Sequence, residues 1–107
     1  MKQAIPDNIA DSSICRALEV FQGKWNAWVL YALRENGELR FGELRRSIPG
    51  ISNTMLSSTL KELEAKGLVS RRQIEGIPPC VIYSLTEKAN GLRDVFAAMN
   101  EWGLRYP

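Results

Sequence analysis

The chain has 107 residues, of which 45% are hydrophobic and 24% are charged, the composition of a single globular domain. Its net charge of +2 does not by itself indicate a nucleic-acid partner. Because the chain has no histidine and its cysteines, Cys15 and Cys80, lie far apart, it lacks His-based catalytic groups and a good zinc ligand set, so we expect no enzymatic activity, metal or cofactor.

The N-terminal segment, residues 1–10, contains a proline among polar neighbours and lacks the features of a signal peptide. We expect a flexible arm here, followed by a single domain over residues 11–107. No apolar run approaches the ~18 residues of a membrane helix, which predicts a cytoplasmic protein without a membrane partner.

Two helices are expected next. Residues 11–13 offer N-cap oxygens, and apolar residues then recur at helical spacing. A second helix over residues 25–33 ends near Asn36-Gly37, and its aromatic content predicts a place in the middle of the core.

A short third helix and a longer fourth one follow. Residues 41–48 have helical spacing and stop at Pro49-Gly50, while Ser52 is a good N-cap for the fourth helix. Gly67 is the expected residue just beyond its C-terminus. The buried stripe of the fourth helix is predicted to be Leu56, Leu60 and Leu63.

The pattern then changes to strands. Leu68–Gln73 and Cys80–Leu85 are predicted to pair as a hairpin, and a further short strand is expected near Glu38–Arg40. Thr86 caps a single last helix. The apolar stripe of that helix is Leu92, Val95, Phe96, Met99 and Trp102. The predicted class is α+β, mainly α.

Two helices joined by a short glycine-containing turn and followed by a hairpin predict a winged helix-turn-helix with a two-stranded wing. In such a unit the second helix enters the DNA major groove. Residues 40–72 carry seven basic and three acidic side chains, a net charge of +4, so the rest of the chain has −2. Cations that cluster in this way are typical of a surface that faces phosphates, although a solvated surface would also explain them.

The fourth helix has small polar residues opposite its buried stripe, where base edges would lie. A solvated face would instead favour Glu, Lys and Arg, which have better helix propensity. Small polar side chains suit base contact, whereas lysine and arginine suit phosphate, and each arginine has the alternative of a plain surface role or an ion pair. The predicted DNA-binding residues are Arg40, Arg45, Arg46, Ser52, Asn53, Thr54, Ser57, Ser58, Lys61, Arg71 and Arg72.

These motifs resemble the HxlR-type winged-helix transcription regulators of bacteria and archaea, distant relatives of the MarR group. The resemblance covers nearly the whole chain, from Cys15 to Gly103. Its pieces include Gly23-Lys24-Trp25, Arg40-Phe41-Gly42-Glu43-Leu44, Ile48-Pro49-Gly50-Ile51-Ser52, Leu60-Lys61-Glu62-Leu63-Glu64, Pro78-Pro79, Tyr83-Ser84-Leu85-Thr86 and Trp102-Gly103.

The resemblance implies a homodimer that binds a pseudo-palindromic DNA operator as a repressor or an activator. It also implies that the first and last helices form the dimer interface. The apolar stripe of the last helix agrees, because a small domain could hardly cover it alone. A small-molecule effector is not indicated, and the alternative to a plain core role for Trp25 and Trp28 is an apolar pocket between helices. The expected interface residues are Ile14, Leu18, Phe21, Leu92, Phe96, Met99 and Trp102.

Some members of the family sense electrophiles or oxidants through an N-terminal cysteine, which implies a sensor role for Cys15. A helix N-terminus and the adjacent Arg16 both favour the reactive thiolate form. The family usually has proline at the position of Arg16, so the setting of the cysteine differs here. The alternative is a small apolar residue that fills a gap in the interface. Cys80 is expected to be structural.

Two other classes of function compete with a DNA-binding regulator. A winged-helix module that binds another protein would use the same surface, although the basic bias and the small polar helix face argue against it. A thiol enzyme is disfavoured, because the chain lacks histidine and has no resolving cysteine near Cys15.

Overall fold

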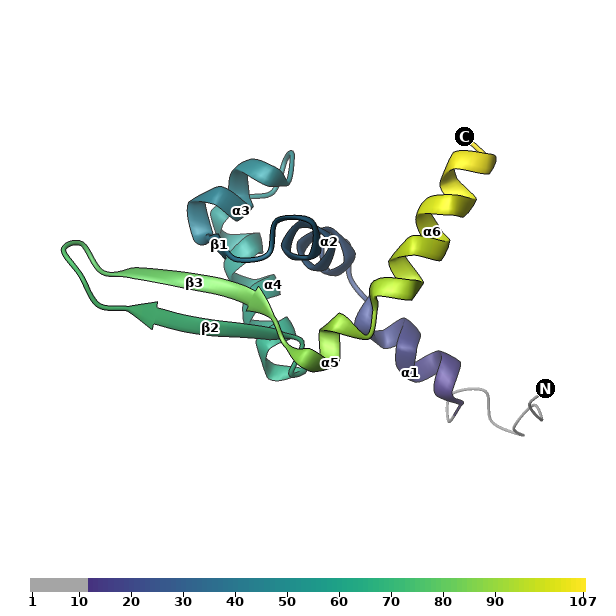
Figure 1. Ribbon diagram of the computed structural model, residues 1–107, viewed down its shortest axis with the longest axis horizontal. Coiled ribbons are helices and arrows are strands. Elements are labelled where there is room, and N and C mark those ends of the chain that lie inside the picture. The colour runs from purple at the N-terminus through teal and green to yellow at the C-terminus, as the bar shows by residue number, and fades with distance from the viewer. Residues whose placement is uncertain (1–11) are drawn as a thin grey trace.

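The computed structural model describes residues 12–107, so the predicted arm of residues 1–10 lies outside the described residues. Figure 1 shows an elongated molecule with a two-stranded wing at one end and two helices, α1 and α6, at the other. The elements in chain order are α1 (Ser13–Val20), α2 (Asn26–Asn36), β1 (Leu39–Arg40), α3 (Phe41–Ser47), α4 (Asn53–Ala65), β2 (Val69–Ile74), β3 (Cys80–Leu85), α5 (Glu87–Asn90) and α6 (Arg93–Arg105).

The three strands form one antiparallel sheet in the order β1-β3-β2. The long pair, β2 and β3, makes the wing, and the expected short strand near residues 38–40 pairs with the other edge of β3. The mainly helical fold with a small sheet confirms the predicted class. In the described part of the chain, no helix is long and apolar enough to cross a membrane.

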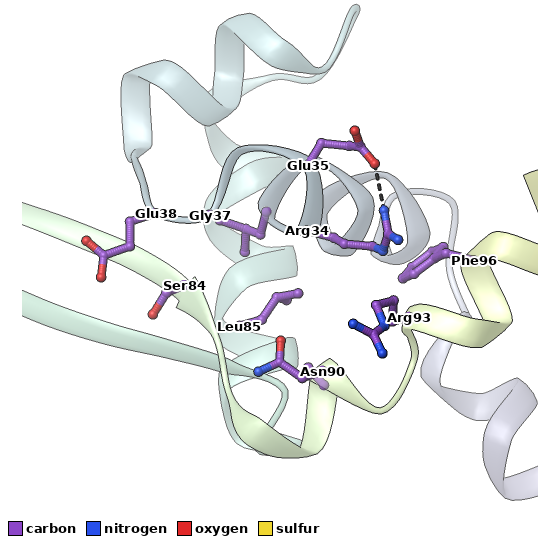
Figure 2. A pocket seen from close by; sticks show the side chains of 11 residues that line it. Arg34, Glu35, Gly37, Glu38, Ser84, Leu85, Asn90, Arg93 and Phe96 are labelled. Atoms are coloured by element: carbon purple, nitrogen blue, oxygen red, sulfur yellow. Dashed lines mark hydrogen bonds and ion pairs between the residues drawn. The ribbon is translucent and has the colours of Figure 1, made fainter.

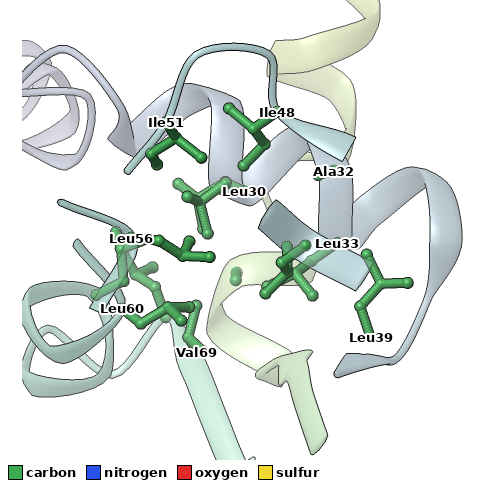
Figure 3. Close-up of a cluster of buried hydrophobic side chains, with 14 of the residues drawn as sticks. Leu30, Ala32, Leu33, Leu39, Ile48, Ile51, Leu56, Leu60 and Val69 are labelled. Carbon is green, nitrogen blue, oxygen red and sulfur yellow. The ribbon is translucent and has the colours of Figure 1, made fainter. Parts of the chain in front are cut away.

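The hydrophobic core surrounds α2, as predicted. The side chains that α2 buries in this core are aliphatic, however, and not tryptophans. Val29, Leu30 and Leu33 are buried, whereas Trp28 is 53% exposed. Leu30 lies between Ile51 and the buried stripe of α4 (Figure 3). Helix α2 is therefore the support on which the two following helices are positioned.

The last helix differs from its prediction, because it is divided into two. Thr86 caps the four-residue helix α5 by accepting a hydrogen bond from the Ala89 backbone N–H, and its own hydroxyl donates to the Gly67 carbonyl at 2.7 Å. Leu92 then occupies the junction, and α6 starts at Arg93. The apolar spacing continues through this junction, so periodicity alone could not reveal the break.

Candidate nucleic-acid interface

The turn between α3 and α4 sets the start of α4 through two local features. Gly50 has a φ of 82°, in the left-handed region that favours glycine. Ser52 is extended, and its Oγ accepts a hydrogen bond from the Met55 backbone N–H at 3.0 Å. This is the predicted N-cap, and it fixes where α4 begins.

Helix α4 has one buried face and one polar face. Its buried side chains are Leu56, Thr59, Leu60 and Leu63, which include the predicted stripe. On the polar face, Ser57 is half-buried and the other side chains are exposed. A hollow of about 600 Å³ lies along this face, lined by Phe41, Asn53, Thr54, Ser57, Ser58 and Lys61. The structure thus brings five of the predicted DNA-binding residues together at one concave surface.

Three of the predicted DNA-binding arginines lie at the two ends of α3, the helix that precedes α4. Arg40 is the N-cap of α3 and is exposed, and its backbone N–H donates to Glu43 Oε1 at 2.9 Å. Arg45 and Arg46 are exposed in the last turn of the helix. Over residues 12–107, no carboxylate forms an ion pair with these three arginines or with Lys61.

The two wing arginines point to opposite faces of the sheet. Arg72 lies opposite Ile82, which in turn lies opposite Arg40, so Arg40 and Arg72 share one face. Arg71 lies opposite Tyr83 on the other face. Arg72 also forms an ion pair with Glu38 at 3.2 Å, so part of its charge is already compensated.

The predicted dimer residues divide into two groups. Phe96 is only 6% exposed, and its ring contacts Phe21 and Tyr31 at centroid distances of 5.9 and 5.7 Å, so it belongs to the core of the protomer. Phe21 and Leu92 are also packed against that core. The residues that remain at the surface are Ile14, Leu18, Met99 and Trp102, with exposures of 62%, 60%, 52% and 66%.

Helix α2 also contributes to this apolar surface, although none of its residues was among the predicted interface residues. Trp28 and Tyr31 line a hollow of about 430 Å³ between α2 and α6, together with Met99 and Leu104. The aromatic residues of α2 were expected to be core. Their position opposite Val29, Leu30 and Leu33 on a helix wheel is the signal that would have assigned them to the surface.

The two cysteines lie at opposite ends of the molecule. Cys15 is half-buried in the first turn of α1, beside a hollow of about 340 Å³ that Leu18, Glu19 and Gln22 also line. Cys80 is the first residue of β3, at the far end of the wing (Figure 1). Both are free thiols, and their separation excludes a disulfide between them within one chain. Residues 12–107 contain no group of three His, Cys, Asp or Glu side chains that could hold a metal.

Comparison with known proteins places this architecture in a family. The family model for the HxlR-like helix-turn-helix matches residues 20–107. The HTH-type transcriptional regulator BH0655 from Halalkalibacterium halodurans is 44% identical over 98 residues, which cover 92% of this chain and 87% of that protein.

Two solved structures are similar along most of their length. The oxidised form of the redox regulator HypR has a TM-score of 0.81 at 38% identity and covers 90% of this chain and 98% of its own. The reduced form of the transcriptional regulator YodB from B. subtilis has a TM-score of 0.77 at 36% identity, with 87% and 90% covered. The chain therefore belongs to the HxlR-like helix-turn-helix family and is a DNA-binding transcriptional regulator.

Proposed function

We propose that the protein acts as a homodimer that binds a pseudo-palindromic operator, with α4 of each protomer in the major groove. The observation that carries this proposal is the hollow along α4, where small polar side chains lie together with Lys61, a cation that has no ion pair among residues 12–107. Asn53 has the amide that suits adenine, and the serines can approach either kind of base pair. Arg45, Arg46 and Lys61 would contact phosphates on either side.

Exposed apolar side chains on α1, α2 and α6 support the homodimer. Helices α1 and α6 lie at the end of the molecule opposite the wing (Figure 1), and side chains of α2 line a hollow that is shared with α6. A twofold dimer formed there leaves both α4 helices free, and two helices must be about 34 Å apart to enter successive turns of the groove. The dimer would therefore impose the half-site spacing of the operator.

Fluorescence-anisotropy titration tests operator binding directly. The probe is the DNA upstream of the protein's own gene, titrated at two salt concentrations beside a random duplex of equal length. Preferential, salt-sensitive binding that Asn53→Ala weakens supports the proposal, with Arg105→Gln as a control far from α4. Equal binding to both duplexes, unchanged in Asn53→Ala, would contradict it and favour a protein-interaction module.

We also propose that Cys15 makes DNA binding sensitive to oxidants or electrophiles. The thiol is free, half-buried and placed in the first turn of α1, beside the apolar surface proposed for dimerisation. HypR is a redox regulator solved in oxidised and reduced forms, and YodB was solved after treatment with diamide. Modification of Cys15 would change how the two protomers meet and hence the spacing of their α4 helices.

The second cysteine provides a matched control for this role. Diamide added with glutathione oxidises the Cys15 thiol and the glutathione thiol to a mixed disulfide and is itself reduced to the hydrazine. This treatment is expected to release wild-type protein and the Cys80→Ser variant from operator DNA, and to leave the Cys15→Ser variant bound. The same response in wild type and in Cys15→Ser would assign the effect to another site. Wild-type binding that diamide leaves unchanged would make Cys15 a packing residue.

A further inference from the structure

The hollow along α4 contains an aromatic residue that the sequence did not assign to DNA binding. Among the described residues that line this hollow, Phe41 alone has a side chain without a polar group. The other five lie on α4 and carry hydroxyl groups, an amide and an amine. Phe41 is instead the first residue of α3. The hollow therefore has a hydrogen-bonding wall from one helix and an aromatic wall from the other.

Phe41 is held in place by the structure around it. Its side chain is half-buried and packs against the hydrophobic core. The preceding residue, Arg40, pairs with Ile82 of β3, and its backbone N–H donates to Glu43 Oε1 at 2.9 Å. A side chain that is already anchored loses little conformational freedom when it contacts a ligand. Phe41 is thus a fixed part of the wall of the hollow.

The chemistry of the ring limits what Phe41 can contact in a major groove. The groove presents hydrogen-bond acceptors, hydrogen-bond donors and one apolar group, the C5-methyl of thymine. A phenyl ring has no hydrogen-bonding side-chain atom, and a base acceptor or donor pressed against it would lose its water without compensation. The methyl group gains from the same contact, because both surfaces are apolar. Thymine is therefore the base that fits this wall.

A cation lies next to the turn that contains Phe41. A Cβ placed on Gly42 would be 3.5 Å from Arg46 Nη1, so the guanidinium of Arg46 reaches back from the last turn of α3 to its first. Arg46 forms no ion pair within residues 12–107. Arginine is a common partner of DNA phosphates. A phosphate held by Arg46 would bring the edge of the groove to Phe41.

We propose that Phe41 selects a thymine in each operator half-site through contact of its ring with the C5-methyl group. The α4 hollow then uses two kinds of recognition, hydrogen bonds from α4 and an apolar contact from α3. Phe41 becomes a specificity-determining residue that lies outside the helix in the groove. This inference rests on the proposed function, because it requires α4 to enter the major groove.

Uracil in place of thymine tests the contact, because it removes the methyl group and keeps every hydrogen-bonding atom. Each thymine of the DNA upstream of the protein's own gene is replaced in turn, and affinities are measured by fluorescence anisotropy. We expect one position in each half-site at which uracil weakens wild-type binding about fourfold. In Phe41→Ala this ratio should fall to about one. Thr54→Ser, which removes the methyl group of another lining residue, should keep the ratio.

Photo-crosslinking of the wild-type protein provides a second measurement that does not depend on the folding of Phe41→Ala. 5-Iodouracil at the sensitive position puts iodine where the methyl group was. Ultraviolet light breaks the carbon–iodine bond, and the ring carbon joins a side chain in contact with loss of hydrogen iodide. Trypsin releases Phe41 within residues 41–45 and the lining residues of α4 within residues 47–61. Mass spectrometry should find the nucleotide on residues 41–45.

The proposal is overturned if no single uracil weakens binding, if Phe41→Ala keeps the wild-type ratio, or if the crosslink is confined to residues 47–61. Failure of the proposed function gives a different result, since the protein would then bind the thymine-containing upstream DNA and a random duplex equally. Specific binding that tolerates uracil at every position would retain the regulator and remove only the role of Phe41.

Discussion

The Lys66 Nζ donates a hydrogen bond to the backbone carbonyl of Glu19 at 2.9 Å. This contact joins the end of α4 to α1, across 47 residues of sequence. Lys66 also forms an ion pair with Glu62 at 3.5 Å, and its own carbonyl accepts a hydrogen bond from Lys88 Nζ. The helix that carries Cys15 is thereby tied directly to the proposed DNA-reading helix.

Replacing Lys66 by methionine should loosen this connection while it keeps the apolar part of the side chain. Loss of the bond to Glu19 is expected to lower the free energy of unfolding by about 0.5–1.5 kcal/mol in urea denaturation. Lys61→Met is the matched control on the same helix, since Lys61 is exposed and has no ion pair in the described structure. Lys61→Met should weaken DNA binding and preserve stability, so the same profile for both variants would contradict this division of roles.

Ser52 should contribute to stability because its side chain caps α4, so another residue that accepts the same hydrogen bond should be able to replace it. Ser52→Ala removes the acceptor for the Met55 N–H and is expected to cost about 1 kcal/mol in urea denaturation. Ser52→Asp keeps an acceptor, so its stability should remain near that of the wild type, while its negative charge repels DNA phosphates. Equal stability of all three proteins would show that the cap contributes nothing.

Arg45 should contribute to the salt dependence of DNA binding more than Arg72 does. Arg45 is exposed and unpaired within the described residues, whereas Arg72 is paired with Glu38. Arg45→Gln is expected to reduce the slope of log affinity against log salt by about 1, as for one lost phosphate contact. Arg72→Gln should reduce it by less. Anisotropy titrations over a range of salt concentrations measure both slopes, and an unchanged slope in Arg45→Gln would rule out its phosphate contact.

Gly50 should resist substitution for reasons of backbone conformation alone. Its φ is 82°, and a Cβ placed on it would meet no atom within 4 Å. Gly50→Ala is therefore expected to destabilise the protein by about 1–2 kcal/mol, and Gly50→Asn by less, because asparagine tolerates the left-handed region better. Thermal or urea unfolding measures the difference. Equal costs for the two variants would point to steric contact or an altered turn.

Trp102 and Phe96 lie on the same helix, but Trp102 should act in dimerisation and Phe96 in the stability of the protomer. Trp102 is 66% exposed, so Trp102→Ser is expected to leave the stability of the protomer nearly unchanged and to shift the protein from dimer to monomer in sedimentation analysis. Phe96 is 6% exposed, and Phe96→Ala should cost about 3–5 kcal/mol of protomer stability. A Trp102→Ser protein that remains dimeric would move the interface elsewhere.

Most of the helix-turn-helix and the wing could be predicted because the sequence patterns that indicate them are local. The cap at Ser52, the stripe at Leu56, Leu60 and Leu63, and the strand Cys80–Leu85 each depend on residues close in sequence. The same applies to the small polar face of α4, whose direction follows from the helical period. The structure places these side chains where that period puts them.

Other features could not be predicted because they depend on tertiary packing. Phe96 lies in the same apolar stripe as Trp102, and periodicity cannot tell whether a stripe covers its own core or remains exposed. The ion pair between Arg72 and Glu38 joins residues on different strands. Arg34 and Arg93 likewise line one cavity (Figure 2) only because α2 and α6 come together in the folded chain. No pattern in the sequence near either residue predicts that arrangement.

The junction at Leu92 makes α6 an arm whose buried anchor on the body is one aromatic side chain, Phe96. In the proposed dimer, the inclination of that arm determines how far apart the two α4 helices stand. Changes of the packing around Phe96 would therefore alter the number of base pairs between half-sites while every base-facing residue stays the same. The residues that select bases and the residues that set the half-site spacing thus lie in different parts of this chain. A substitution can therefore change one property and leave the other unchanged.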